Sequence, residues 1–204
     1  MKTIAIISFK GGTAKTSTSL HVGAALSQFH KSKVLLIDFD AQANLTAGLG
    51  FDPDEHDSLA PVLQGTCNIR DVIRKTENPK LDVIPADTWL ERVEVTGALA
   101  ADRYSHERLK SILENLDYDY IIIDTPPLGI IAAYLAIEKN IDYTLIIVRN
   151  DFSKKASVKR IDKLITDYNL QAGILYNGAK VEYSYGAIIA ICLRLQVIKP
   201  TLSH

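Results

Sequence analysis

The stretch Phe9–Ser17, FKGGTAKTS, constrains the fold of this chain more than any other. A short apolar run, Ile4–Ile7, precedes it, and a helix-like stretch begins near Lys15. A strand, a glycine-rich turn and a helix that starts with Lys-Thr form a phosphate cradle, because the N–H groups of the turn and the helix dipole both favour an anion. We expect Lys15 to reach the β- and γ-phosphates of a nucleotide and the Thr16 hydroxyl to ligate Mg²⁺.

The turn departs from the usual pattern G-x-x-x-x-G-K-[ST] at two positions, since Phe9 and Ala14 stand where that pattern has glycine. The alternative interpretation is a Gly-Gly turn beside two solvated lysines. The strand before the turn and the helix after it favour nucleotide binding. The predicted ATP-binding residues are Lys10, Gly11, Gly12, Thr13, Ala14, Lys15, Thr16 and Ser17.

Acidic residues end two further apolar runs. The run Val34–Asp38 ends in Asp38, and Asp40 follows two residues later. The run Tyr120–Asp124 ends in Asp124, as in a Walker B pattern, and Thr-Pro-Pro follows it. Functional groups on open α/β sheets gather at the carboxyl ends of strands, so these acids can point at a Mg²⁺–phosphate site. The predicted Mg²⁺ ligands are Thr16, Asp38 and Asp124. The alternative interpretation of Asp38 and Asp40 is that their carboxylates only cap a loop.

The order of apolar runs and helix-like segments predicts an α/β fold. We expect a doubly wound, mostly parallel sheet with helices on both faces, because continuous apolar strands of this kind need cover on both sides. The predicted strands are 4–8, 34–38, 81–85, 120–124, 141–149 and 173–176, and the predicted helices include 15–30 and 69–75, the second capped by Asn68. We expect a single P-loop domain over residues 1–180 and an atypical tail over 181–204.

Composition limits the functional classes. The chain has 204 residues with 47% hydrophobic content and a net charge of −1, so any basic patch must be local. Cys67 and Cys192 match no metal or redox spacing and suit a reducing cytosol. The start lacks a long apolar segment of a signal peptide, and the late run Ala187–Ile198 is too short to span a bilayer. We therefore expect a cytoplasmic protein without stable membrane insertion.

The three nucleotide motifs together resemble those of a known family. The segment from Lys10 to Thr16 resembles the deviant P-loop K-G-G-x-G-K-[ST] of the ParA/MinD ATPases, Asp38–Thr46 resembles their switch I motif D-x-D-P-Q-G-N, and D-T-P-P resembles switch II. From Met1 to about Pro127 the chain looks like a Soj/ParA partition ATPase. The resemblance implies that Lys10, Lys15 and Asp40 are catalytic: Lys10 crosses an ATP-dependent homodimer to the partner's phosphates, and Asp40 orients the attacking water. It also implies a Mg²⁺-dependent ATPase that binds DNA nonspecifically, associates with the nucleoid and meets a ParB-like adaptor.

Beyond Pro127 the likeness changes. The segment 147–178 and the tyrosines that follow look more like the back half of a bacterial tyrosine kinase domain. Three alternatives to a partition ATPase therefore stay open: a P-loop protein-tyrosine kinase, a MinD-like membrane-positioning ATPase that uses the apolar tail, and a P-loop protein that binds nucleotide without turnover.

A basic helix is predicted at 154–168, capped by Ser153. Its Lys155, Lys159 and Lys163 recur at i, i+4 and i+8 and form one stripe. The stripe is either a solvated helix face or a surface that contacts DNA phosphates.

Overall fold

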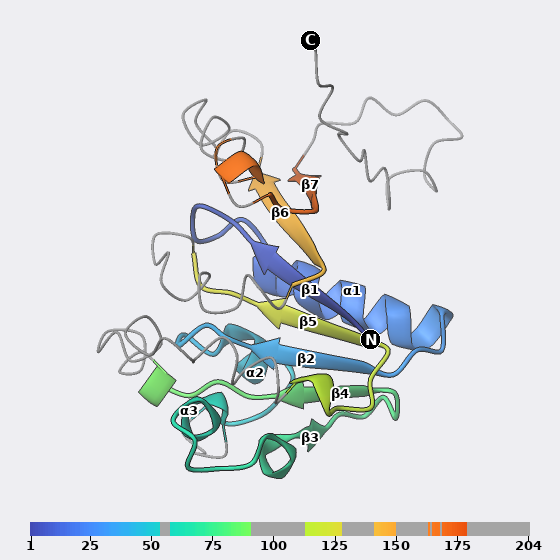
Figure 1. Cartoon of the computed structure of the whole chain (residues 1–204), viewed down its shortest axis with the longest axis vertical. Helices are drawn as coiled ribbons and strands as arrows, with labels where there is room; N and C mark the ends of the chain where they lie inside the picture. Colours follow the sequence, from blue (N-terminus) through green and yellow to red (C-terminus); the bar gives the residue numbers. More distant parts are fainter. Residues whose placement is uncertain are drawn as a thin grey trace.

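The computed structural model describes residues 1–53, 58–90, 113–127, 141–149, 163, 165–167 and 169–178. Within these residues one seven-stranded sheet has the order β3-β4-β2-β5-β1-β6-β7 (Figure 1). All neighbouring strands are parallel except β3 and β4. The strands are β1 Lys2–Ile7, β2 Val34–Asp38, β3 Arg74–Lys75, β4 Leu81–Ile84, β5 Tyr120–Asp124, β6 Tyr143–Arg149 and β7 Ala172–Asn177. The predicted mostly parallel α/β sheet is confirmed.

Alternate residues of the central strands pack into two separate cores. Ile6, Leu36 and Ile122 face one side, where they pack with Leu20 and Leu26 of the helix that follows the P-loop. The side chains next to them along each strand face the other side and join a second core. Because both faces of β1, β2 and β5 are buried, these strands are apolar without alternation, which is why the sequence identifies them.

Different helices cover the two faces. Helices α1 (Lys15–Phe29) and α2 (Asn44–Gly48) contribute to the core that contains Ile6. Helix α3 (Leu59–Leu63) and the 3₁₀ helix η1 (Ile69–Val72) contribute to the other core. The sheet is therefore doubly wound, as the sequence predicts.

Helix α1 turns a stripe of small residues toward the sheet. Ser19, Gly23 and Ser27 are its buried positions after Lys15, whereas the expected apolar positions Leu20, Ala24, Ala25 and Leu26 are only half-buried. A Cβ placed on Gly23 would lie 2.8 Å from Cδ2 of Leu36 in β2. The small residues thus allow α1 to lie close to the strands that it crosses.

The predicted helix over 69–75 is wrong in its second half. Asn68 caps it as expected, because its Oδ1 accepts a 3.0 Å hydrogen bond from the N–H of Arg70. The helix ends at Val72, and Arg74–Lys75 instead pairs antiparallel with β4. An ion pair of 2.7 Å between Lys75 and the buried Asp82 stabilises this pairing, which local sequence does not reveal.

Two predictions lie largely outside the described residues: the basic helix over 154–168, apart from Lys163 and residues 165–167, and the tail over 181–204. The domain limits of 1–180 therefore stay a prediction. Across the part of the chain that the structure describes, we find no helix with the length and apolar character needed to cross a membrane.

Candidate nucleotide site

The P-loop, residues 9–17, joins the carboxyl end of β1 to α1. The carbonyl of Lys10 organises its turn by accepting hydrogen bonds from the hydroxyls of Ser8 at 2.8 Å and Thr13 at 3.4 Å. Gly11 and Gly12 are exposed, and a Cβ added to either would meet no atom within 4 Å. The loop therefore has open space in front of its backbone, as a phosphate cradle requires.

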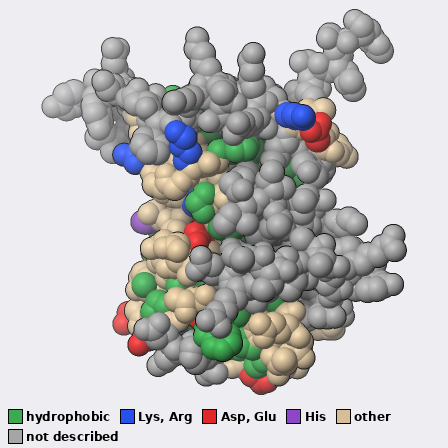
Figure 2. Space-filling model, turned by 90° about the vertical axis from the view of Figure 1, so that its left-hand side faces the viewer, with side chains coloured by type: hydrophobic (Ala, Val, Ile, Leu, Met, Phe, Trp, Pro, Cys, Tyr) green, Lys and Arg blue, Asp and Glu red, His purple; other side chains and the backbone are tan. Residues whose placement is uncertain are grey.

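Figure 2 looks onto the edge at which β1, β2 and β5 end. The described Lys and Arg side chains of this face lie in its upper half, at the level of β1 and β6, and the described Asp and Glu side chains lie mostly in its lower half (Figure 2).

Ala14 and Ala43 both adopt the left-handed conformation that glycine prefers. Ala14 precedes α1 with φ of 75°, and Ala43 precedes α2 with φ of 49°. The carbonyl of Ala14 accepts hydrogen bonds from the N–H of Thr18 at 3.0 Å and from its hydroxyl at 2.7 Å, so α1 begins on this strained residue. A side chain at such a position costs about 1 kcal/mol relative to glycine.

Three charged side chains converge behind the P-loop. Lys15 is buried, and burial lowers the pKa of its ammonium group, while attraction to Asp124 and Asp40 opposes that effect. Asp124 ends β5 and Asp40 follows β2, so the sheet brings together residues that are far apart in the sequence. The structure therefore brings Lys15, Asp40 and Asp124 together, and their joint role in nucleotide binding stays a prediction.

Asp124 has the properties of a metal-ligating carboxylate. Its Oδ1 accepts a 3.0 Å hydrogen bond from the Ser19 hydroxyl, and its Oδ2 is buried without a hydrogen-bond partner among the described residues. Burial raises the pKa of Asp124 to about 6, against the opposing effect of the Thr16 and Ser19 hydroxyls and of the Lys15 charge. An unpartnered buried carboxylate oxygen near a threonine hydroxyl fits Mg²⁺, which prefers oxygen ligands.

The described residues hold no cluster of three His, Cys, Asp or Glu side chains suited to a metal ion. Mg²⁺ at this place would therefore need phosphate oxygens and water to complete its six ligands, as in nucleotide sites generally.

Asp38 is held by hydrogen bonds within the switch I segment, residues 38–46. Its Oδ1 accepts from the N–H of Asp40 at 3.2 Å, and its Oδ2 accepts from the N–H and hydroxyl of Thr46 at 2.9 and 2.8 Å. Burial raises the pKa of Asp38 to about 7, although these hydrogen bonds oppose the effect. A direct contact between Asp38 and Mg²⁺ stays a prediction.

Asp40 starts a tight turn. Its carboxylate Oδ1 accepts a 3.1 Å hydrogen bond from the N–H of Gln42, and its carbonyl accepts a 2.8 Å bond from the N–H of Ala43. The carboxylate is thereby fixed, largely buried and close enough to Lys15 to oppose the lowering of the pKa of that ammonium group.

Comparison with known proteins shows the family of this chain. A family model described as "AAA domain" (AAA_31) matches residues 1–173. A "ParA family protein" of Chlamydia trachomatis is 74% identical over 129 residues, which are 62% of this chain and 51% of that protein. The sporulation initiation inhibitor protein Soj of Bacillus subtilis is 42% identical over 129 residues, 62% of this chain and 50% of Soj. The chain belongs to the AAA-domain family of ParA/Soj-type proteins.

Solved structures extend the comparison. Cobyrinic acid a,c-diamide synthase from Mycobacterium smegmatis with bound ADP and magnesium superposes with a TM-score of 0.76 at 29% identity, over 86% of this chain and 74% of that one. The same synthase with an ATP analogue and magnesium gives a TM-score of 0.74. The chain spans about half the length of the curated relatives above. The family match runs to residue 173 and so includes β6 and the start of β7, part of the segment for which the sequence suggested a tyrosine kinase.

In this ParA-family chain two residues at the ends of β6 and β7 donate hydrogen bonds to the P-loop, and sequence reasoning missed both. Arg149, at the end of β6, donates a 2.7 Å hydrogen bond from Nη1 to the Gly12 carbonyl. Asn177, at the end of β7, donates a 3.2 Å bond from Nδ2 to the Thr13 carbonyl. The available signal was the position of each polar residue at the carboxyl end of a parallel strand.

Two predicted functions of lysine side chains stay untested by the structure. Lys155 and Lys159 lie outside the described residues, and Lys163 is exposed in a helical segment. Lys10 is exposed at the P-loop, so the predicted contact with a partner's phosphates stays a prediction.

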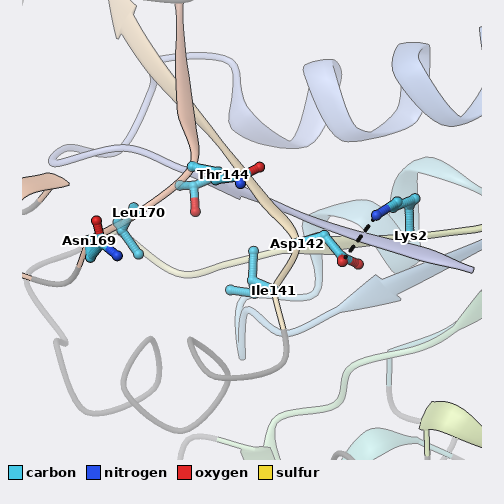
Figure 3. Close-up of a pocket in the computed structure, with 7 residues that line it drawn as sticks. Lys2, Ile141, Asp142, Thr144, Asn169 and Leu170 are labelled. Carbon is cyan, nitrogen blue, oxygen red and sulfur yellow. Dashed lines mark hydrogen bonds and ion pairs between the residues drawn. The ribbon is translucent and has the colours of Figure 1, made fainter. Parts of the chain in front are cut away.

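A separate hollow of about 350 Å³ lies at the opposite edge of the sheet (Figure 3). Asp142 lines it, pairs with Lys2 at 3.5 Å and accepts a 2.7 Å hydrogen bond from the N–H of Thr3. Both charged side chains are well exposed, so the pair contributes little to stability.

Proposed function

We propose that this ParA-type chain is a Mg²⁺-dependent ATPase that converts ATP and water to ADP and phosphate. The observation that carries the proposal is the buried Oδ2 of Asp124, which has no hydrogen-bond partner among the described residues. The charged side chains of Lys15 and Asp40 lie near this carboxylate. The relatives' family and the ADP and magnesium in the synthase structure support it.

In this mechanism each side chain has one task. The P-loop N–H groups of residues 10–17 bind the phosphates, and Lys15 neutralises charge on the β- and γ-phosphates. Thr16 and Asp124 would hold Mg²⁺, with Asp38 as a further candidate ligand, and the ion would neutralise charge that develops on the γ-phosphate. Asp40 orients the attacking water and accepts its proton.

Two variants separate binding from turnover. Lys15→Ala should abolish ATP binding in calorimetry, because it removes the ammonium group that is buried behind the P-loop. Asp40→Ala should keep ATP affinity but lose phosphate release. Lys2→Ala, at the opposite edge of the sheet, is the matched control and should behave like the parent. Undiminished ATP affinity in Lys15→Ala would place the phosphate site elsewhere.

We further propose that ATP closes a homodimer, with Lys10 at the partner's γ-phosphate, and that the dimer acts in chromosome or plasmid partition in the cytoplasm with a ParB-like adaptor. The support is the family and the exposed position of Lys10. Sedimentation with and without ATP tests dimer formation. A parent that stays monomeric with ATP contradicts the dimer, and a Lys10→Ala variant that hydrolyses ATP at the parental rate contradicts the role of Lys10.

Nonspecific DNA binding is the last part of the proposal. Binding should be insensitive to sequence and weaken steeply with salt, because bound counterions are released. Changing Lys155, Lys159 and Lys163 to Glu should abolish DNA retention without altering ATP affinity. A gel-shift assay with ATP at two salt concentrations measures DNA retention and its dependence on salt. If the parent binds no DNA at low salt, the partition role fails for this chain.

A further inference from the structure

Thr46 makes three hydrogen bonds although it is completely buried. Its hydroxyl donates to Oδ2 of Asp38 at 2.8 Å, and its N–H donates to the same oxygen at 2.9 Å. Its hydroxyl oxygen also accepts a 2.9 Å bond from the N–H of Ala86. One small side chain therefore connects the switch I segment to the loop that follows β4.

The sheet explains why these groups meet. Strands β2 and β4 are parallel neighbours, with Ile37 opposite Ile84. Asp38 follows Ile37 by one residue and Ala86 follows Ile84 by two, so both lie at the carboxyl edge, and both are fully buried. The N–H of Ala86 lies beyond the end of the β4 ladder, and the Thr46 hydroxyl satisfies it.

The connection continues to Asp40. The second oxygen of Asp38, Oδ1, accepts the N–H of Asp40 at 3.2 Å. The hydrogen bonds thus run from Ala86 through Thr46 and Asp38 to the backbone of Asp40, whose carboxylate is largely buried near Lys15. In a buried polar network each member fixes the orientation of the next, and an unsatisfied member disturbs its neighbours.

We propose that Thr46 is a positioning residue for ATP hydrolysis, which holds Asp40 in place through Asp38 and the β4 loop. The proposal rests on the proposed ATPase function. The hydroxyl of Thr46 is both donor and acceptor, whereas its methyl group can make no hydrogen bond, so we assign the effect to the hydroxyl.

Two substitutions separate the hydroxyl from the methyl group. Thr46→Val keeps the shape and removes the hydroxyl, and Thr46→Ser keeps the hydroxyl and removes the methyl. We expect Thr46→Val to lower kcat by roughly tenfold or more, since small misplacements of a positioned group have effects of this size. Its ATP Kd should stay within about twofold of the parent, because the P-loop cradle is untouched. Thr46→Ser should keep kcat within about threefold of the parent, because the hydrogen bonds remain.

The control is Thr66→Val, which removes an exposed hydroxyl that donates to the Pro61 carbonyl far from the site. It should leave kcat and Kd unchanged. The proposal is overturned if Thr46→Val hydrolyses ATP at the parental rate, if Thr46→Ser loses as much kcat as Thr46→Val, or if Kd weakens in step with kcat. A parent that binds ATP without hydrolysing it overturns both the proposed ATPase and this inference. If the parent hydrolyses ATP and Thr46→Val has the same kcat, only this inference is overturned and the proposed ATPase stands.

Amide hydrogen exchange of the parental protein gives a test that needs no variant to fold. The N–H groups of Asp40, Thr46 and Ala86 should exchange as slowly as those of the central strands, although all three lie outside the sheet. Exchange as fast as that of the exposed Gly11 and Gly12 overturns the network and the positioning role with it.

Discussion

The Ser19 hydroxyl in α1 donates a 3.0 Å hydrogen bond to Oδ1 of Asp124 at the end of β5. Ser19 lies one helical turn after Lys15, and it also bonds the Lys15 carbonyl at 3.2 Å. The helix that carries the P-loop lysine therefore also orients the carboxylate proposed to hold Mg²⁺. The other oxygen, Oδ2, is left for a ligand.

Ser19→Ala should weaken Mg²⁺ binding. Groups that orient a metal-ligating side chain typically change metal affinity by about tenfold or more, so we expect the Mg²⁺ concentration for half-maximal ATP turnover to rise by roughly tenfold. Titration of phosphate release against Mg²⁺ measures it. Ser27→Ala removes another buried hydroxyl two turns further along α1 and serves as the control. Equal Mg²⁺ dependence in all three proteins would show that Ser19 does not orient Asp124.

Ala14→Gly should stabilise the protein by about 0.5–1 kcal/mol, because glycine adopts the left-handed conformation at φ of 75° without strain. Urea denaturation measures the free energy of unfolding. Ala24→Gly, at a right-handed position inside α1, should instead destabilise by about 1 kcal/mol. We expect ATP affinity in Ala14→Gly to be equal or somewhat tighter. Clearly weaker binding would show that the P-loop is built around the methyl group.

Gly23→Ala should destabilise the protein by about 1–3 kcal/mol, since the new methyl group would lie 2.8 Å from Cδ2 of the buried Leu36. Gly48→Ala adds the same methyl group in α2, where nothing lies within 4 Å. Thermal denaturation of both variants compares them, and Gly48→Ala should unfold at or above the parental temperature. If the unfolding temperature falls equally in both variants, the close approach of α1 to β2 does not cause the destabilisation of Gly23→Ala.

The nucleotide-free, Mg²⁺-free protein should lose stability as the pH rises from about 4 to about 7. Burial raises the pKa of Asp38 to about 7 from its ordinary 3.8, so the folded chain keeps a proton that the unfolded chain has released. Stability falls with pH wherever the folded state binds more protons, and Asp124, with its pKa raised to about 6, acts in the same direction.

Asp38→Asn should reduce the loss of unfolding free energy with rising pH by roughly 1 kcal/mol per pH unit between pH 5 and 7, because one titrating proton is lost. Urea denaturation at several pH values measures the slope. The control is Asp117→Asn, because Lys33 lowers the pKa of the exposed Asp117 and so keeps its titration below this window. An unchanged slope in Asp38→Asn would mean that Asp38 is charged throughout.

The sequence was sufficient for the strands that end at the site, because their residues are buried on both faces and give continuous apolar runs. It was not sufficient where a contact depends on register between distant segments. Thr46 meets Ala86, and Arg149 and Asn177 meet the P-loop, only through the order of parallel strands. Strand β3 has two residues, and its pairing with β4 depends on Asp82, which lies outside the local pattern.

The alanines show a second limit. Alanine favours right-handed helix, so the sequence predicts no strain at Ala14 or Ala43, where the motifs of the family have glycine. The structure keeps the left-handed backbone at both positions in spite of the substitution. Loop shape at this site is thus set by the hydrogen bonds that surround it rather than by local preference.

The position of β1 in the sheet affects how the sheet is made. Lys2 lies opposite Tyr120 and Ile4 lies opposite Tyr143, so β1 is synthesised long before either of its two neighbouring strands. At typical synthesis rates this strand waits on the order of ten seconds for β5 to be made. During that time an apolar segment has no ladder partner, and long-range pairing of this kind is slow even when the chain is complete. A nascent chain that stops before Tyr120 would therefore present an unpaired apolar strand to chaperones and to other copies of itself.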